Sequence, residues 1–440
     1  MQDEMKQCWN LTETFSRRAL EEFQSQQLFA LVRYLEQRNP YHRERFRMAG
    51  LEAKNFRGLA DLHRLPFSEK KHMQQALETT LPLLPNRDLL RWHQTSGTSG
   101  TPTRFPDSRR DWIAYSDLAA SALFAMGVRR EDTALAAFSY GPHIAFWSYL
   151  SGLDRIGTTV VAAGGLTSEA RIGLLVDYKV TVLLGTPSYA MHLAAIAPSI
   201  GVDLAKDCQI RLMVTTAEPN PPELKQKLRQ CWGAAVYDRL GSTETGGIAF
   251  ECPENPNLYH VQENYLIAEI LDEDDQLVHP GEDGELIITT LFRRSMPLVR
   301  YRTGDIVRRS RSEGCPCGRS FLSLQSTQNG AIVRRMDDMR KVRGVLLSPS
   351  EIETIVQEQP GIGEQYQAII HTCDNSDEIT LRVEPLPNTS PARSQKIKRE
   401  LEKKFYQRLF LRFNIEVLEY GSLPRVADKA QKIIDQRLGK

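Results

Sequence analysis

Apolar residues recur at two different spacings along the chain, and each spacing predicts a different kind of element. Between Leu20 and Leu35 apolar side chains recur every three to four residues until Asn39-Pro40 ends the pattern, which predicts an amphipathic helix. A further helix is expected to begin at Ser68. The first part of the chain is therefore predicted to be helical, and it carries no residues to which chemistry can be assigned.

From residue 111 onward, helical stretches alternate with short apolar runs rich in β-branched residues. Helices are expected over residues 111–126, 168–178 and 221–232, and strands over residues 133–138, 158–163, 181–184, 211–215, 234–237 and 285–291. Alternation of this kind with short connections is typical of a parallel sheet covered by helices. We therefore predict an α/β fold whose large N-terminal domain contains helix-covered β-sheets.

Small and polar residues follow several of these predicted strands. They are Gly164-Gly165, Gly185-Thr-Pro-Ser-Tyr189, Ala217-Glu-Pro219 and Asp238-Arg-Leu-Gly-Ser-Thr-Glu244. In open α/β sheets, ligands bind beyond the carboxyl ends of the strands. A binding site is therefore expected where these segments meet.

The last part of the chain has its own pattern. Charge replaces apolar residues around Arg335-Met-Asp-Asp-Met339, which favours a hinge between domains. Beyond it we expect paired strands over residues 367–371 and 378–383, a basic helix over 392–409 and a final strand over 414–419. The predicted domains are residues 1–335 and a small α+β C-terminal domain of residues 336–440.

Composition limits the classes of function. The 440 residues are 41% hydrophobic and 25% charged, with a formal net charge of +1, which fits a soluble globular protein of two or three domains and provides no overall field for nucleic acid or membranes. No apolar run has membrane-spanning length, and the N-terminus lacks a signal-peptide core. We expect a cytoplasmic protein with neither nucleic-acid nor membrane partners, and the formation of a homodimer is left open.

A loop rich in glycine, serine and threonine is the first candidate for chemistry. It comprises Thr95, Ser96, Gly97, Thr98, Ser99 and Gly100, with Thr103 shortly after. Because glycine lacks a Cβ, such a loop can wrap backbone N–H groups and hydroxyls around phosphate. No Lys-Ser/Thr pair follows at the spacing of the common P-loop, and a surface linker is the alternative interpretation.

Two short pairs of soft ligands form a second candidate. Cys315 and Cys317 are separated by one residue, and Cys252 and His260 flank a turn upstream. Three thiols and an imidazole match a closed structural zinc site, although the Cys-x-Cys spacing is shorter than the usual Cys-x₂-Cys. The alternative is spare core thiols. The remaining cysteines are isolated, and seven in total do not indicate a disulfide framework.

Taken together, the motifs resemble the adenylate-forming superfamily, and within it the phenylacetate–CoA ligase family. Five motifs in the same order carry the resemblance: Thr95-Ser-Gly-Thr-Ser-Gly100, Gly185-Thr-Pro-Ser-Tyr189, Ala217-Glu-Pro219, Tyr301-Arg-Thr-Gly-Asp305, and Asp337-Asp-Met339 with Val342-Arg-Gly-Val345. The resemblance runs from near Phe15 to the end of the chain. It also includes the Cys315-Pro-Cys-Gly-Arg319 element that relatives commonly show.

The resemblance implies an activity and its cofactors. A carboxylic acid, aromatic and phenylacetate-like, would attack the α-phosphorus of ATP with Mg²⁺, giving an acyl-adenylate and pyrophosphate. Coenzyme A would then displace AMP. The alternative acceptors are a carrier-protein thiol, an amine or a hydroxyl in a biosynthetic pathway, and a degenerate ligand-binding relative is the non-enzymatic alternative.

The same resemblance assigns nucleotide contacts. The loop Thr95–Gly100 with Thr103 would hold the β- and γ-phosphates, and Thr243 the α-phosphate. Glu244 would hold Mg²⁺, and Asp305 would accept both ribose hydroxyls. The alternatives are a solvated loop acid for Glu244 and an Asx-turn for Asp305. The remaining contacts to the nucleotide are expected from Ala217, Glu218, Pro219, Asp238, Arg239, Gly241, Ser242 and Arg335.

Two further sets of residues follow from the resemblance. An acyl pocket is expected from Phe138, Tyr140, Gly185, Pro187 and Tyr189, of which Pro187 and Tyr189 have a turn and a core role as alternatives. In the tail, Lys429 would bridge the carboxylate and the phosphate as charge grows, with Lys432 and Lys440 as competitors. Asp337 is expected at the hinge on which a mobile C-terminal domain rotates, with Arg343 and Gly344 near the thiol channel.

Overall fold

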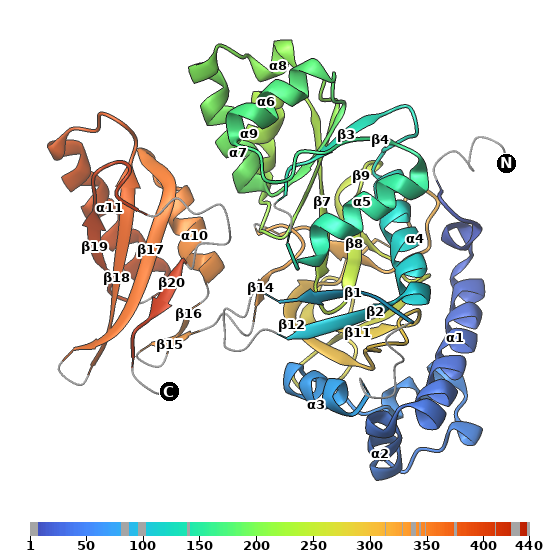
Figure 1. The fold of residues 1–440 in the computed structure, drawn as a ribbon. Coiled ribbons are helices and arrows are strands. Elements are labelled where there is room, and N and C mark those ends of the chain that lie inside the picture. The colour runs from blue at the N-terminus through green and yellow to red at the C-terminus, as the bar shows by residue number, and fades with distance from the viewer. Residues whose placement is uncertain are drawn as a thin grey trace. The chain divides into compact units, whose positions relative to one another are not determined.

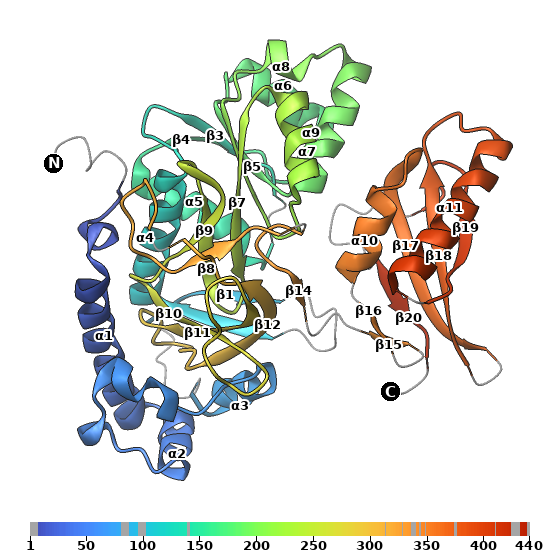
Figure 2. The same ribbon diagram turned by 180° about the vertical axis from the view of Figure 1, so that it is seen from behind.

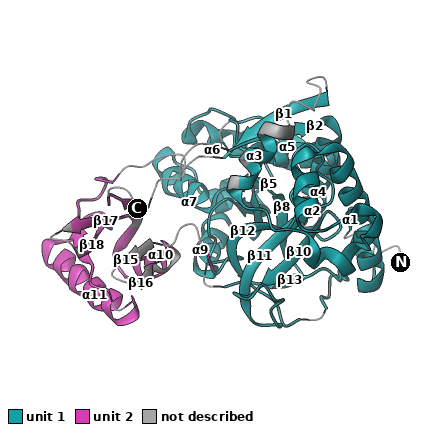
Figure 3. Ribbon diagram, turned by 90° about the horizontal axis from the view of Figure 1, so that it is seen from below, with its two compact units in different colours: residues 1–333 teal, residues 334–440 magenta. Residues whose placement is uncertain are grey.

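The computed structural model divides the chain into two compact units, residues 1–333 and 334–440 (Figures 1 and 3). The predicted boundary at residue 335 falls beside this division. The structure describes residues 8–80, 88–95, 103–138, 141–312, 314–327, 329–335, 340–342, 345–347, 349–373, 376–409, 411–423 and 432–437.

The N-terminal helices form the predicted helical segment. They are α1 (Arg17–Arg38), α2 (Pro40–Met48) and α3 (Lys70–Thr80), with 3₁₀ turns at Leu11–Thr14, Ala53–Asn55 and Gly58–Arg64. Ser16 caps α1, and Asn39 caps α2 with Pro40 at its first position, so the Asn-Pro pair both ends one helix and begins the next. Leu28, Leu31 and Leu35 pack in a core cluster with Ile267 and Leu291 of unit 1.

An eight-stranded sheet is the centre of unit 1. Its strand order is β13-β9-β8-β7-β6-β5-β3-β4. The strands are β3 (Thr133–Ala136), β4 (Thr159–Val161), β5 (Val182–Gly185), β6 (Leu212–Thr216), β7 (Ala235–Ser242), β8 (Gly246–Cys252), β9 (Asn255–Val261) and β13 (Ser323–Gln325). Pairing is parallel from β4 to β7 and antiparallel from β7 to β13.

Helices cover both faces of the parallel half (Figure 1). On one face lie α4 (Arg109–Ala125) and α5 (Ile144–Ile156), and on the other α6 (Ser168–Asp177), α7 (Pro187–Ile196) and α9 (Pro222–Trp232), with the short α8 (Leu204–Asp207) beside α9. Neighbouring residues of β5 separate the two layers, because Leu184 packs with α4 and α5 whereas Leu183 packs with α6, α7 and α9. The helix-covered sheet predicted from the alternation is confirmed.

Two details of the sheet differ from the sequence prediction. The strand expected over residues 234–237 runs on to Ser242, so Asp238, Arg239 and Leu240 lie within β7 rather than in a loop after it. The sheet is also mixed rather than wholly parallel. The turn at residues 243–245 is too short for a crossover, so β8 can return only antiparallel to β7.

The other strands of unit 1 form smaller sheets. β10 (Leu266–Leu271), β11 (Asp283–Thr290) and β12 (Tyr301–Arg308) pair antiparallel in that order. β1 (Leu89–Gln94) and β2 (Arg104–Ser108) form a hairpin that leads directly into α4.

Unit 2 begins at β14 (Arg334–Arg335), followed by the hairpin of β15 (Arg340–Val342) and β16 (Val345–Leu347), and by α10 (Pro349–Gln357). Its four-stranded sheet has the order β19-β18-β17-β20, with bounds Asn414–Val417, Ser376–Pro385, Ile362–Cys373 and Ile433–Asp435. Helix α11 (Pro391–Leu409) lies beside this sheet (Figure 2), and its Ile397, Leu401 and Phe405 are buried in the same core cluster as residues of the sheet. The predicted α+β architecture is thus observed.

Candidate active site

The Gly/Ser/Thr loop connects the two strands of a hairpin. Residues 96–102 lie outside the described residues, but both ends of the loop are fixed. The backbone N–H of Thr95 donates to the Thr103 carbonyl at 3.0 Å, and the Thr103 N–H donates to the Thr95 side-chain oxygen at 3.0 Å. Both threonines are buried. The hairpin therefore holds Thr95 and Thr103 together at the two ends of the predicted phosphate loop.

A buried arginine links this hairpin to the turn that carries Glu244. Arg293 donates to Asp107 of β2 at 2.8 Å and to the backbone carbonyl of Glu244 at 2.7 Å. The exposed fractions of the two ion-paired side chains are 0% and 1%. Sequence reasoning missed Arg293, and the available signal was a pair of arginines that follows directly on an apolar strand.

The predicted phosphate and magnesium residues lie on the tight turn between β7 and β8. Thr243 and Glu244 are partly exposed, and the side-chain oxygens of Ser242 and Thr245 lie 2.9 Å apart across the turn. Gly241 lies opposite Gly247 at the base of this turn. Gly246 has φ +80°, and a Cβ there would lie 2.5 Å from the Tyr115 ring, so this position needs glycine.

The loops after β5 and β6 lie side by side, because Gly185 pairs with Thr215 in the parallel ladder. Thr186 caps α7, Pro187 takes its first position, and Glu218 accepts hydrogen bonds from the backbone and the hydroxyl of Ser188 at 3.2 and 2.9 Å.

The loop after β6 carries an unusual backbone conformation. Ala217 has φ +72°, a left-handed conformation that is uncommon for a residue with a Cβ, and Pro219 follows it in the same loop. Strain of this kind clusters at functional sites, and the nucleotide contact of residues 217–219 stays a prediction.

Asp305 occupies a strand rather than a free turn. It lies in β12, where its exposed fraction is 2%, and it directly follows Gly304, whose φ is +72°. The Thr303 hydroxyl accepts from the Asp305 N–H at 3.0 Å, opposite an irregularity in β11 between Glu285 and Ile287. Such bulges redirect side chains next to active sites.

The Asp238 carboxylate is engaged inside the protein. It accepts from Thr215 at 3.1 Å and from Tyr259 at 2.9 Å, and Lys225 lies within the same network through Glu251. Burial raises the pKa of Asp238 to about 6, against the opposing effect of Lys225. The structure therefore gives this carboxylate interior partners in the sheet.

The predicted acyl-pocket residues divide between the two faces of the sheet. Phe138 stacks on Tyr149 of α5, with ring centroids 5.6 Å apart. Tyr189 packs on the opposite side, where its hydroxyl lies 3.1 Å from that of Ser168. Gly185 and Tyr189 line a small apolar crevice together with Ala137 and Leu183, and Pro187 is buried. Tyr140 lies outside the described residues.

Most of the predicted C-terminal residues lie outside the described residues as well. These are Asp337, Arg343, Gly344, Lys429 and Lys440. Arg335 is the second residue of unit 2 and lies in β14. Lys432, a competitor of Lys429, is paired with Glu353 at 2.5 Å and lies over the ring of Tyr366, so its ammonium already has a partner.

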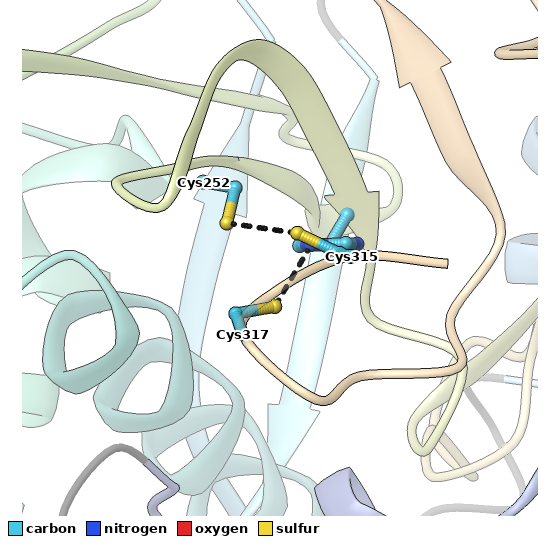
Figure 4. A group of neighbouring side chains, drawn as sticks. Cys252, Cys315 and Cys317 are labelled. Carbon is cyan, nitrogen blue, oxygen red and sulfur yellow. Dashed lines mark hydrogen bonds between the residues drawn. The ribbon is translucent and has the colours of Figure 1, made fainter. Parts of the chain in front are cut away.

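The four predicted metal ligands converge on one point (Figure 4). The ligand atoms of Cys252, His260, Cys315 and Cys317 all lie within 4.8 Å of one another. The Cys252 and Cys315 sulfurs are 3.5 Å apart, and the Cys317 sulfur lies 3.2 Å from His260 Nε2. A tetrahedron with zinc–sulfur bonds of about 2.3 Å has edges of about 3.8 Å, so these separations suit one tetrahedral ion.

Supporting contacts orient this cluster. The second ring nitrogen of His260 lies 3.1 Å from the Ser323 hydroxyl, which leaves Nε2 directed at the sulfurs. Hydrogen bonds from Cys252 and His260 hold the pKa of Cys317 far below its usual range, whereas the hydrogen bond with Cys317 raises the pKa of Cys252. Arg319, in the same loop, forms a buried ion pair with Glu13 at 2.6 Å.

Comparisons with known proteins place both parts of the chain in one enzyme family. The AMP-binding enzyme family matches residues 27–291, and the AMP-binding enzyme C-terminal domain matches residues 344–437. The phenylacetate–coenzyme A ligase of Thermus thermophilus is 32% identical over 84% of this chain and 83% of its own. That of Pseudomonas putida is 28% identical, over 97% of this chain and 96% of its own.

A solved structure shares the fold over nearly the whole chain. The crystal structure of 2-hydroxyisobutyryl-CoA ligase in complex with 2-HIB-AMP superposes with a TM-score of 0.86 at 25% identity, covering 96% of this chain and 91% of that one. No helix in the described part of this chain is long and apolar enough to cross a membrane. The chain therefore belongs to the AMP-binding enzyme family and is a relative of the phenylacetate–coenzyme A ligases.

Proposed function

We propose that the protein is an AMP-forming acid–coenzyme A ligase. In the first step a carboxylate oxygen of the acid bonds to the α-phosphorus of ATP, and the bond from that phosphorus to pyrophosphate breaks. In the second step the sulfur of coenzyme A bonds to the acyl carbon, AMP leaves with the electron pair of the acyl–oxygen bond, and the thiol proton passes to solvent. The acid is proposed to be aromatic, as in the phenylacetate–coenzyme A ligases that the chain resembles.

The contact through Arg293 is the observation that carries this proposal. It connects Asp107, on the hairpin of the phosphate loop, to the backbone of Glu244, the proposed Mg²⁺ ligand. Phosphoryl chemistry depends mostly on positioning and on neutralising charge, so a rigid connection between these two segments is what the first step needs.

The remaining residues are proposed to act around this connection. Thr95, Thr103 and Thr243 hold the phosphates, Glu244 holds Mg²⁺, and Asp305 holds the ribose. Residues 217–219 line the adenine beside Gly241 and Ser242. Arg335 is proposed to contact the nucleotide, and Lys429 to stabilise the charge of the transition state. When bound, Mg²⁺ neutralises charge on the phosphate oxygens.

Pyrophosphate release measured with and without coenzyme A, across aryl and alkyl acids, tests the proposal. We expect pyrophosphate release to require an acid. We expect AMP and the thioester to form only when coenzyme A is added. Glu244→Gln should lower the rate by about 100-fold or more, because a lost metal ligand removes several kcal/mol of charge stabilisation. Glu273→Gln, in an exposed turn, is the matched control. Acid-dependent pyrophosphate release without thioester would indicate another acceptor.

We further propose that Cys252, His260, Cys315 and Cys317 bind a structural zinc ion. Three thiols and one imidazole without an open position suit a closed site rather than a catalytic one. Elemental analysis of the purified protein should give close to one zinc per chain, and a value well below one would contradict the site. A cytoplasmic location is also proposed, on the absence of a membrane-spanning helix among the described residues.

A further inference from the structure

Arg239 is a buried cation with most of its hydrogen-bonding capacity unused. Its exposed fraction is 5%, and among the described residues it donates a hydrogen bond to the Ser148 hydroxyl at 3.3 Å. Nε and Nη2 have no hydrogen-bond partner among the described residues. A guanidinium offers five N–H donors, so the greater part of this one is left to a partner that the described residues do not provide.

The charge of Arg239 also lacks a counter-charge among the described residues. The adjacent Asp238 lies on the other face of β7, where it accepts from Tyr259 and Thr215. The guanidinium instead lies over the Tyr149 ring, 5.3 Å from its centroid. Buried charges in proteins are normally paired, because an isolated one is costly.

Arg239 lies near the turn that carries Glu244 and near residues expected from the sequence to bind the acid. A Cβ at Gly247 would lie 2.1 Å from Nη2, so the glycine three residues after Glu244 leaves room for the guanidinium beneath that turn. On the other side, Tyr149 stacks on Phe138, one of the residues expected from the sequence to line an acyl pocket. The unpaired donors therefore lie between the metal-binding turn and the place expected for the acid.

We propose that Arg239 is a specificity-determining residue that binds a second anionic group on the acid, so that the enzyme activates acids with two carboxylates. The inference rests on the proposed function and adds the substrate class. One carboxylate pairs with the planar guanidinium, whose fork suits a two-point contact, while the other attacks ATP. An acid with a single carboxylate leaves the buried cation unpaired.

Matched acids that differ by one carboxylate test the inference. Specificity constants for pyrophosphate release are compared for phenylacetate against 4-carboxyphenylacetate, and for butyrate against glutarate. The wild type should favour the diacids by about 100-fold or more, because leaving one partner of a buried charge pair unpaired is costly. Arg239→Met should abolish this preference, and Arg239→Lys should retain part of it. Arg155→Met, at a half-exposed arginine of α5, is the control and should change neither.

A preference of the wild type for the monoacids would overturn the inference, as would an equal loss with all acids in Arg239→Met. The thermal stability of Arg239→Met distinguishes a role of Arg239 in recognising the acid from a structural role. Without any acid, Arg239→Met should unfold at the same temperature as the wild type or higher, because an unpaired buried cation is removed. A fall of several degrees would assign Arg239 a structural partner and overturn the inference.

Binding of the acids, measured without turnover, tests the inference about Arg239 independently of the proposed function. The unfolding temperature is measured with each acid in the presence of Mg²⁺ and an α,β-methylene analogue of ATP. If a diacid raises the unfolding temperature of the wild type but not that of Arg239→Met, recognition by Arg239 is supported. This holds even if no acid is turned over and the proposed function fails. If turnover occurs but diacids and monoacids raise the unfolding temperature equally, the proposed function stands and the inference about Arg239 is overturned.

Discussion

Replacing Arg293 by methionine should damage both the stability of unit 1 and the first half-reaction. The change removes a guanidinium that is fully buried and lies 2.8 Å from Asp107, and it also removes the donor to the Glu244 carbonyl at 2.7 Å. Breaking a buried pair costs about 3–5 kcal/mol, because the remaining charge is left without compensation. Loss of the hydrogen bond to the partly buried Glu244 carbonyl costs about 1 kcal/mol more.

The cost of the lost ion pair and the cost of the lost hydrogen bond are not additive, because both come from one side chain and the structure around it can relax. We therefore expect the free energy of unfolding to fall by about 4 kcal/mol. Asp107 limits the loss. Burial already raises the pKa of this carboxyl, and without Arg293 it can take up a proton instead of remaining charged. The double variant Arg293→Met/Asp107→Asn should therefore recover about 2 kcal/mol of the loss.

Urea unfolding followed by tryptophan fluorescence measures this change in unit 1 alone. All five tryptophans of the chain, Trp9, Trp92, Trp112, Trp147 and Trp232, lie in residues 1–333. Arg308→Met is the matched control: Arg308 pairs with Asp283 at 2.6 Å, but the two side chains are 44% and 28% exposed. An exposed pair of this kind contributes at most about 1 kcal/mol.

Two results would refute the reasoning about Arg293. One is a loss in Arg293→Met no larger than in Arg308→Met, and the other is a double variant that is as unstable as the single one. Acid-dependent pyrophosphate release should fall in Arg293→Met by about 10-fold or more, because displacement of the Glu244 turn by a fraction of an ångström misplaces the metal ligand.

Three further predictions concern the metal cluster, the tail and acid stability. Cys317→Ser should lose the bound zinc and unfold at a lower temperature, whereas Cys231→Ser, at an exposed thiol, should keep both. Lys429→Ala should abolish adenylate formation but spare thioester formation from a supplied adenylate, and equal loss in both half-reactions would contradict its role. Burial and then Arg45 lower the pKa of His42 to about 3, so the unfolded chain binds more protons below the ordinary histidine value and stability falls as the pH falls through this window. The slope from His42 is about 1.4 kcal/mol per pH unit, and it should be absent in His42→Asn and unchanged in a variant of the exposed His143, such as His143→Gln.

Local pattern was sufficient for part of the secondary structure and for the order of the motifs, whereas α5, α7, β8 and β9 were not predicted. Helix α1 was predicted because its apolar spacing and the Asn39-Pro40 pair that ends it are properties of neighbouring residues. The cluster of three cysteines and a histidine was also predicted from sequence, because two short Cys/His pairs are recognisable before the fold brings them together, although Cys252 and Cys315 are 63 residues apart.

The sequence pattern gave a wrong prediction where polar side chains are buried in the interior. Asp238 and Arg239 read as a loop after a strand, but both lie within β7, because their side chains find partners or room inside the sheet. Those partners come from elsewhere in the chain, so no window around residue 238 contains the reason for the longer strand.

The sequence by itself determined the fold class, the family motifs and the candidate ligands, because spacing and residue type are local. Only the tertiary structure decided which charges are paired. It joined Asp107 to Arg293 across 186 residues of chain, and it placed Arg239 in the interior without a counter-charge among the described residues. The physical reason is that the cost of burying a charge depends on what surrounds it in space, and those surroundings come from segments far apart in the sequence.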